Sequence, residues 1–180
     1  LALNNLKQGR DFLDGIEDER FLAYDFVDVS AGEEQKEAFL AYKRQAAQGN
    51  ATAQVRLGQC YADGVGVEAD PKAAVDWYRR SAEQGDATGQ VMLGVCYVEA
   101  TGVEADPRAA VDWFRKAAEQ GNARAQRCLG ACYENGVGVE ADPQVAVEWY
   151  RRAAEQGDAV AQWFLGLCYE DGVGVDADPR

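Results

Sequence analysis

The sequence contains no histidine, and this absence removes several kinds of site at once. Without histidine the chain cannot form the Ser–His or Cys–His pairs that activate nucleophiles, and it lacks the commonest metal ligand. Basic residues are also scarce, 18 against 31 acidic ones, which gives a formal net charge of -13. A negative chain is repelled by nucleic acid and by anionic lipid. We therefore expect no enzyme, no cofactor, no metal and no nucleic-acid partner.

Long hydrophobic runs are absent as well. No stretch approaches the roughly 20 apolar residues that a helix needs to cross a bilayer. We therefore expect no membrane insertion.

What the sequence does contain is a repeat. Cys60, Cys96, Cys132 and Cys168 are separated by steps of 36 residues, and each lies in a Leu-Gly-x-Cys-Tyr run. The tryptophans, prolines and glycines of the units recur at the same interval. A fixed period of this size is typical of an array of stacked structural repeats.

One unit is read as two helices joined by a loop. Asn50 is a good N-cap for a first helix over residues 51–62, and Asp70 caps a second helix over residues 71–84, which begins with proline and ends at Gly85. We expect Tyr61 and Trp77 to fill the core of the unit, and Gly58 to lie where the two helices approach too closely for a side chain.

The period also divides the chain. We expect an irregular helical cap over residues 1–32 and an array of repeats over residues 33–180. Within the array we expect a degenerate second helix at 35–48, full repeats at about 50–85, 86–121 and 122–157, and a partial repeat at 158–180. Asp178 and Pro179 match the start of a second helix, so we expect the array to continue beyond Arg180.

The first helix of each unit has one constant face and one variable face. The variable positions recur at i, i+3, i+4 and i+7, a single stripe of a helix, and several of them are apolar. Drift in water would leave mostly polar residues, whereas an exposed apolar patch often marks a binding site. The residues that we expect to contact a partner are Val55, Arg56, Gln59, Val91, Met92, Val95, Arg127, Ala131, Trp163, Phe164 and Leu167. Trp163 and Phe164 have an alternative role, packing on an element beyond Arg180.

The cysteines are expected to be buried and reduced. Equivalent cysteines lie one repeat apart, and packed helices are about 8 to 10 Å from each other, which is beyond the reach of a disulfide. This favours a reducing compartment such as the cytoplasm and leaves the periplasm open. Acidic pairs such as Glu68 with Asp70 recur in the loops, where a basic partner or calcium could bind, but helix capping and solvation account for them and the calcium-loop spacing is missing.

The pattern Ala-x-Ala-Gln-x-x-Leu-Gly-x-x-Tyr, Gly-Val-x-x-Asp and Ala-x-x-Trp-Tyr/Phe resembles the Sel1-like (Sel-one-like) repeat, a relative of the tetratricopeptide repeat. It is carried by Ala51, Ala53, Gln54, Leu57, Gly58, Tyr61, Gly66, Val67, Asp70, Ala74, Trp77 and Tyr78 and by their counterparts at steps of 36. Some secreted bacterial relatives join each helix pair by cysteines eight residues apart, but here Glu68 stands eight residues after Cys60.

The resemblance implies an all-α, right-handed superhelical solenoid of helix-turn-helix repeats. It implies that the first helices face the concave side and that the protein is a non-enzymatic scaffold or adaptor for a peptide or partner protein, in signalling or complex assembly. An alternative is a regulatory or targeting module of a larger enzyme whose catalytic domain lies outside this sequence. Self-association through the open C-terminal end of the array is a further expectation.

Overall fold

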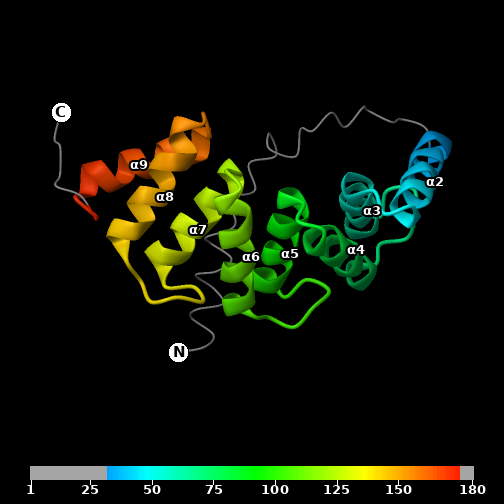
Figure 1. Cartoon of the computed structure of the whole chain (residues 1–180), viewed down its shortest axis with the longest axis horizontal. Helices are drawn as coiled ribbons and strands as arrows, with labels where there is room; N and C mark the ends of the chain where they lie inside the picture. Colours follow the sequence, from blue (N-terminus) through cyan, green and yellow to red (C-terminus); the bar gives the residue numbers. More distant parts are fainter. Residues whose placement is uncertain (1–31, 175–180) are drawn as a thin grey trace.

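The computed structural model describes residues 32–174, which form helices and loops with no strand in that range. The helices are α2 (Gly32–Ala47), α3 (Ala51–Asp63), α4 (Pro71–Glu83), α5 (Ala87–Glu99), α6 (Pro107–Glu119), α7 (Ala123–Asn135), α8 (Pro143–Glu155) and α9 (Ala159–Asp171). They follow one another along a curved array, with α2 at one end and α9 at the other (Figure 1). We call α3, α5, α7 and α9 the A helices, and α2, α4, α6 and α8 the B helices.

The predicted caps begin the helices. The Asn50 carboxamide oxygen accepts a hydrogen bond from the backbone N–H of Ala53 at 2.8 Å, and one Asp70 carboxylate oxygen accepts two, from Lys72 and Ala73, at 3.1 Å. The ends differ by one residue from the prediction, since α3 continues to Asp63 and α4 stops at Glu83. The predicted cap over residues 1–32 lies outside the described residues, apart from Gly32, which begins α2.

Within each complete repeat, the A helix packs closely on its B helix through a glycine. A β-carbon built on Gly58 would lie 2.5 Å from Cε1 of Tyr78, so no larger residue fits without displacing the ring. Gly94 meets Phe114 and Gly130 meets Tyr150 in the same way. The expectation for Gly58 is thus confirmed.

The aromatic residue in this contact is Tyr78, whereas we expected Tyr61 and Trp77 in the core, and both of these are partly buried and pack against it. Tyr78 is almost completely buried, whereas its neighbour Trp77 is only partly buried and lies under the Arg80 guanidinium, whose carbon is 4.5 Å from the ring centroid. Trp77 still packs on the edge of the core. Tyr78 fills the centre of the repeat, because its side chain points at the glycine of the A helix.

A buried glutamine ties successive helices together. The Gln54 amide nitrogen donates to the carbonyl of Ala46 at the end of α2, at 3.3 Å, and its oxygen accepts from the side chain of Gln84 at the end of α4, at 2.6 Å. Gln90 and Gln126 repeat both bonds one and two units later. Because a buried amide needs partners for its polar atoms, these bonds set the position of each A helix against the two B helices beside it.

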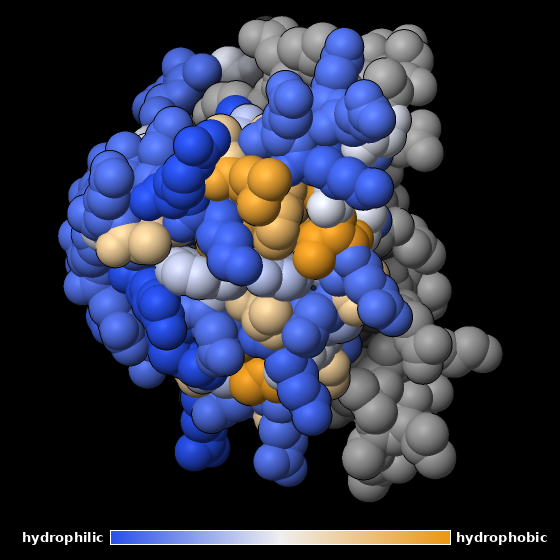
Figure 2. Space-filling view, turned by 90° about the vertical axis from the view of Figure 1, so that its right-hand side faces the viewer, coloured by the Kyte–Doolittle hydropathy of each residue, from blue (hydrophilic) through white to orange (hydrophobic). Residues whose placement is uncertain are grey.

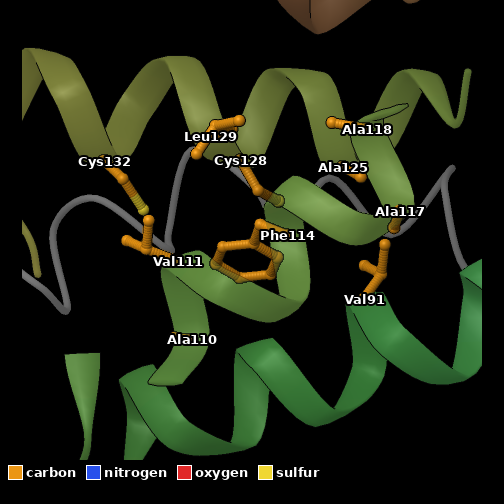
Figure 3. Packing of buried hydrophobic residues seen from close by; sticks show 10 residues of the cluster. All are labelled: Val91, Ala110, Val111, Phe114, Ala117, Ala118, Ala125, Cys128, Leu129 and Cys132. Carbon is orange, nitrogen blue, oxygen red and sulfur yellow. The ribbon is translucent and has the colours of Figure 1, made fainter. Parts of the chain in front are cut away.

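The apolar core of the described residues forms four successive clusters, and the partly buried tyrosines Tyr61, Tyr97 and Tyr133 each pack against two of them. Figure 3 shows its central part, where the Phe114 ring of α6 lies among side chains from α5 and α7. The residues of this cluster are Val91, Ala110, Val111, Phe114, Ala117, Ala118, Ala125, Cys128, Leu129 and Cys132. Each repeat therefore buries part of its apolar surface against its neighbour, as a solenoid requires.

The first three A helices lie closer to one another than successive B helices do. α3 contacts α5, and α5 contacts α7, more extensively than any two consecutive B helices in the described residues contact each other. The A helices thus form the inner side of the curve, which we call the inner surface. None of the helices between residues 32 and 174 is both long and apolar enough to cross a membrane.

Candidate binding surface on the A helices

The variable stripe of the A helices is only partly accessible. Val55 and Val91 are 4% and 1% exposed, because each packs in an apolar cluster with the B helix of its own repeat and the A helix of the following one. Ala131 is buried in a cluster with Val147 and Tyr150. The expectation of an open surface is therefore wrong at these positions, where the stripe is covered by packing between helices.

Arg127 is the fourth buried member of the predicted set. Its side chain is 1% exposed, and its Nε lies 3.2 Å from a carboxylate oxygen of Asp158, which is itself 7% exposed. Asp158 is also the N-cap of α9 and accepts a hydrogen bond from Ala161 at 2.8 Å. A buried guanidinium is tolerated only with such a counter-charge, so Arg127 joins α7 to the start of α9 instead of facing a partner.

The accessible part of the stripe begins at a hollow between α3 and the start of α5. Its lining residues are Thr52, Val55, Arg56, Gln59, Asp86 and Thr88. Arg56 and Asp86 place opposite charges at this hollow, and the threonines and Gln59 add hydrogen-bonding groups. Two of the predicted residues, Arg56 and Gln59, are thus brought together with polar neighbours that the prediction did not include.

An apolar strip continues from the hollow along α5. Met92 and Val95 are both partly exposed. The Met92 sulfur lies 3.8 Å from a guanidinium nitrogen of Arg124 on α7, which is also partly exposed. The inner surface therefore has an apolar centre with an arginine on the neighbouring helix on each side, Arg56 on α3 and Arg124 on α7.

The last three predicted residues lie on α9. Trp163 is 58% exposed and meets the edge of Phe164, with ring centroids 4.9 Å apart. Phe164 is partly buried because its ring stacks on Tyr150 of α8, at 5.2 Å between centroids. Leu167 is partly exposed. These side chains form a cluster at the end of the described array, separate from the hollow between α3 and α5.

The cysteines are buried free thiols, as predicted. Burial raises the pKa of the Cys96 thiol to about 12 and raises the pKa of the other four thiols as well. A thiol reacts as its thiolate, so these side chains are protonated and poorly nucleophilic near neutral pH. Within residues 32–174, no three Cys, Asp or Glu side chains are grouped so that they could hold a metal ion.

The acidic loops are exposed. Glu68 and Asp70 lie on the surface, and the Asp70 carboxylate accepts hydrogen bonds from backbone N–H groups in the first turn of α4. The corresponding residues Asp176 and Asp178 lie outside the described residues.

Paired helices stacked with a period of 36 residues around a shared core define the chain as an α-solenoid. A family model described as the Sel1 repeat matches residues 51–86, 87–122, 123–158 and 159–180. The chain belongs to the Sel1 repeat family, which confirms the resemblance and the expected right-handed solenoid fold. Proteins of this family are generally protein-interaction scaffolds and are typically non-catalytic.

Two solved structures resemble the chain over nearly all of its length. One is c5321, a protective antigen present in uropathogenic Escherichia coli strains, with 35% identity and a TM-score of 0.75 over 97% of this chain and 34% of that protein. The other is a Sel1 repeat protein from Oxalobacter formigenes, with 31% identity and a TM-score of 0.72 over 97% of this chain and 77% of that one. The chain thus spans about a third of the length of c5321. No curated protein sequence matches it significantly.

Proposed function

We propose that this chain is a scaffold that binds a peptide segment of a partner protein on the inner surface, between α3 and α7. The observation that carries the proposal is the hollow beside Arg56 and Gln59, which continues into the partly exposed apolar strip of Met92 and Val95. An apolar strip bordered by polar groups is the usual composition of a site that binds a protein segment.

The side chains specify what kind of segment would bind. An apolar residue would rest on Met92 and Val95, where methionine adapts to different shapes. Carboxylates on either side of that residue would approach Arg56 and Arg124, which can form charge-assisted hydrogen bonds. The threonines of the hollow can bond to the backbone of the segment. The expected ligand is therefore an acidic peptide with a central apolar residue, despite the acidic character of the chain as a whole.

The test is selection of peptides from a random library on the immobilised protein, followed by measurement of their affinities. We expect the selected peptides to share an apolar residue flanked by Asp or Glu. A double variant, Met92→Asp with Val95→Asp, should weaken their binding by at least about tenfold, or ~1.4 kcal/mol.

The matched control adds the same charge away from the inner surface. Ala105→Asp with Gln144→Asp changes two exposed residues, one in the loop before α6 and one in the first turn of α8. It should bind like the unmodified chain, and circular dichroism should show equal helix content in all three proteins. Equal weakening by both double variants would show that total charge, and not the inner surface, governs binding, and the proposal would fall.

A regulatory or targeting module of a larger enzyme would use the same surface. The peptide experiment applies to that alternative without change, because it tests the surface and not the protein that contains it.

A further inference from the structure

α9 carries the glycine of an A helix without the aromatic residue that fills this position elsewhere. In the three complete repeats, Gly58, Gly94 and Gly130 each meet the ring of a B helix. Around Gly166, no atom of the described residues lies within 4 Å of the place where a β-carbon would be, and Gly166 is exposed. In residues 32–174, α9 is thus an A helix whose outer face has no B helix against it.

The opposite end of the array has the complementary feature. α2 is a B helix with no A helix before it in the described residues, and it places Ala38 and Tyr42 at the positions of Ala74 and Tyr78. Ala74 and Tyr78 are both 2% exposed, whereas Ala38 and Tyr42 are only partly buried. Figure 2 shows apolar residues gathered at the centre of this end of the molecule, with hydrophilic residues around them.

We propose that two copies of this chain join head to tail, so that α2 of one copy completes the repeat that α9 of the other copy begins. The ring of Tyr42 would then lie on Gly166 as the ring of Tyr150 lies on Gly130 in the third repeat. The two surfaces are at opposite ends of the array (Figure 1), so they cannot meet within one copy. This surface differs from the peptide site, and the inference does not depend on that site.

A polar match supports this pairing of the ends. In the third repeat, the Tyr150 hydroxyl donates a hydrogen bond of 2.7 Å to Glu134 of the A helix. The counterpart of Glu134 on α9 is Glu170, which is exposed. The other two repeats lack this glutamate, with Ala62 and Val98 in its place. The junction would therefore repeat the tyrosine–glutamate pair of the third repeat.

The exposure of Trp163 is explained by the same junction. Its counterparts Val55 and Val91 are at most 4% exposed, since each packs in a cluster that includes the following A helix, and Arg127 is 1% exposed, where it pairs with Asp158 at the start of the following A helix. In a head-to-tail assembly, α3 of the second copy takes the place of that following helix. The junction thus buries the most exposed large apolar side chain of the described residues.

Such an interface is heterologous, because each copy contributes a different surface. Heterologous contacts do not close at two copies but continue into longer chains or rings. The average mass should therefore rise with concentration beyond that of a dimer, starting from the 19.6 kDa monomer.

The experiment is sedimentation equilibrium of the full 180-residue chain and of two blocked variants. Gly166→Leu blocks the tail and has room to fold in the single chain, since nothing in the described residues lies within 4 Å. Tyr42→Ala removes the ring from the head. Each variant alone should be monomeric, and an equal mixture should form a dimer and nothing larger, because only one intact head and one intact tail remain to meet. Ala105→Leu, which adds an apolar side chain to an exposed position in the loop before α6, away from both ends of the array, should assemble like the parent.

The possible outcomes are distinct. A parent chain that stays monomeric as its concentration rises overturns the proposal, whatever covers the two ends. Self-association of Tyr42→Ala at parental strength also overturns it, since that result means α9 pairs with α9. If circular dichroism shows that Tyr42→Ala has lost helix content, the Gly166→Leu variant decides alone, and its assembly at parental strength would refute the junction.

Discussion

Ser81 in α4 and Gly89 in α5 form a contact at which this chain departs from its own pattern. The corresponding pairs in the following repeats are Ala117 with Ala125 and Ala153 with Ala161, and these four residues are completely buried. A β-carbon on Gly89 would lie 2.6 Å from the Ser81 hydroxyl oxygen, 2.7 Å from its β-carbon and 2.9 Å from the next backbone nitrogen. The larger residue on one helix is therefore offset by the smaller one on the other.

The magnitudes follow from this geometry. Gly89→Ala gains about 1 kcal/mol of helix propensity but overpacks a tight contact, which costs about 1–3 kcal/mol, so we expect a net loss of about 1 kcal/mol. Ser81→Ala removes a buried hydroxyl that has no hydrogen-bond partner among the described residues. Burying such a group costs about 1–3 kcal/mol, so we expect this change to stabilise by about 1 kcal/mol.

The double variant recreates the alanine pair of the other repeats. It keeps the propensity gain and removes the oxygen, but the new β-carbon still lies 2.7 Å from the β-carbon of residue 81 and 2.9 Å from the next backbone nitrogen, so the two helices must move apart toward the spacing of those repeats. We expect it to be about 1 kcal/mol more stable than the parent, which implies a coupling free energy of about 1 kcal/mol between the two sites, within the range for residues in contact.

Urea denaturation of the parent, the two single variants and the double variant measures this coupling, provided that the slope of the transition is unchanged. A coupling free energy near zero would refute the reasoning, because the two substitutions would then act independently. A Gly89→Ala variant more stable than the parent would show that the contact relaxes without cost.

Three further predictions concern stability. Ala100 ends α5 with a φ of 57°, where the other A helices have glycine. Ala100→Gly should raise the free energy of unfolding by about 1 kcal/mol, and the reverse change Gly136→Ala should lower it by a similar amount. Thermal unfolding should then show opposite shifts of Tm for the two variants. Gly94→Ala would bring a β-carbon to 2.6 Å from Phe114 and should lower the free energy of unfolding by about 1–3 kcal/mol, which lowers the urea midpoint; an unchanged midpoint would contradict the close contact. Burial raises the pKa of Cys96 to about 12, whereas a thiol in the unfolded chain has a pKa of about 8.5. The free energy of unfolding should therefore be independent of the Cys96 thiol below about pH 8.5 and should fall above it by up to about 1.4 kcal/mol per pH unit. Unfolding followed at increasing pH should show this decline, and Cys96→Ala should make it shallower.

Much of the fold could be predicted because the signals are local. The helix starts depend on Asn50, Asp70 and their counterparts, whose side chains bond to backbone within three residues, so the sequence alone places them. The period of 36 residues reveals the stacking, since every unit must bury the same surface against its neighbour. The need for glycine at position 58 could also be predicted, because the Leu-Gly pair recurs at steps of 36 residues.

The candidate site could be predicted only in part. Helical periodicity grouped Val55 with Arg56 and Gln59 on one stripe, but it does not show where the next repeat covers that stripe. Seven of the eleven predicted residues remain at least partly exposed, and Val55, Val91, Arg127 and Ala131 are buried. One signal could have indicated that Arg127 is buried: it is charged, whereas the equivalent residues of the other repeats, Val55, Val91 and Trp163, are apolar.

The sequence by itself determined the helix pairs, their period, the caps and the family, since these depend on contacts within one unit or on its exact repetition. The tertiary structure alone decided that Tyr78 and not Trp77 fills the repeat, that Arg127 pairs with Asp158, and that the accessible part of the stripe lies around Met92. Each of these outcomes depends on which side of a helix the neighbouring repeat covers. Burial depends on how the helices stack, so it cannot be predicted from a residue's position along one helix.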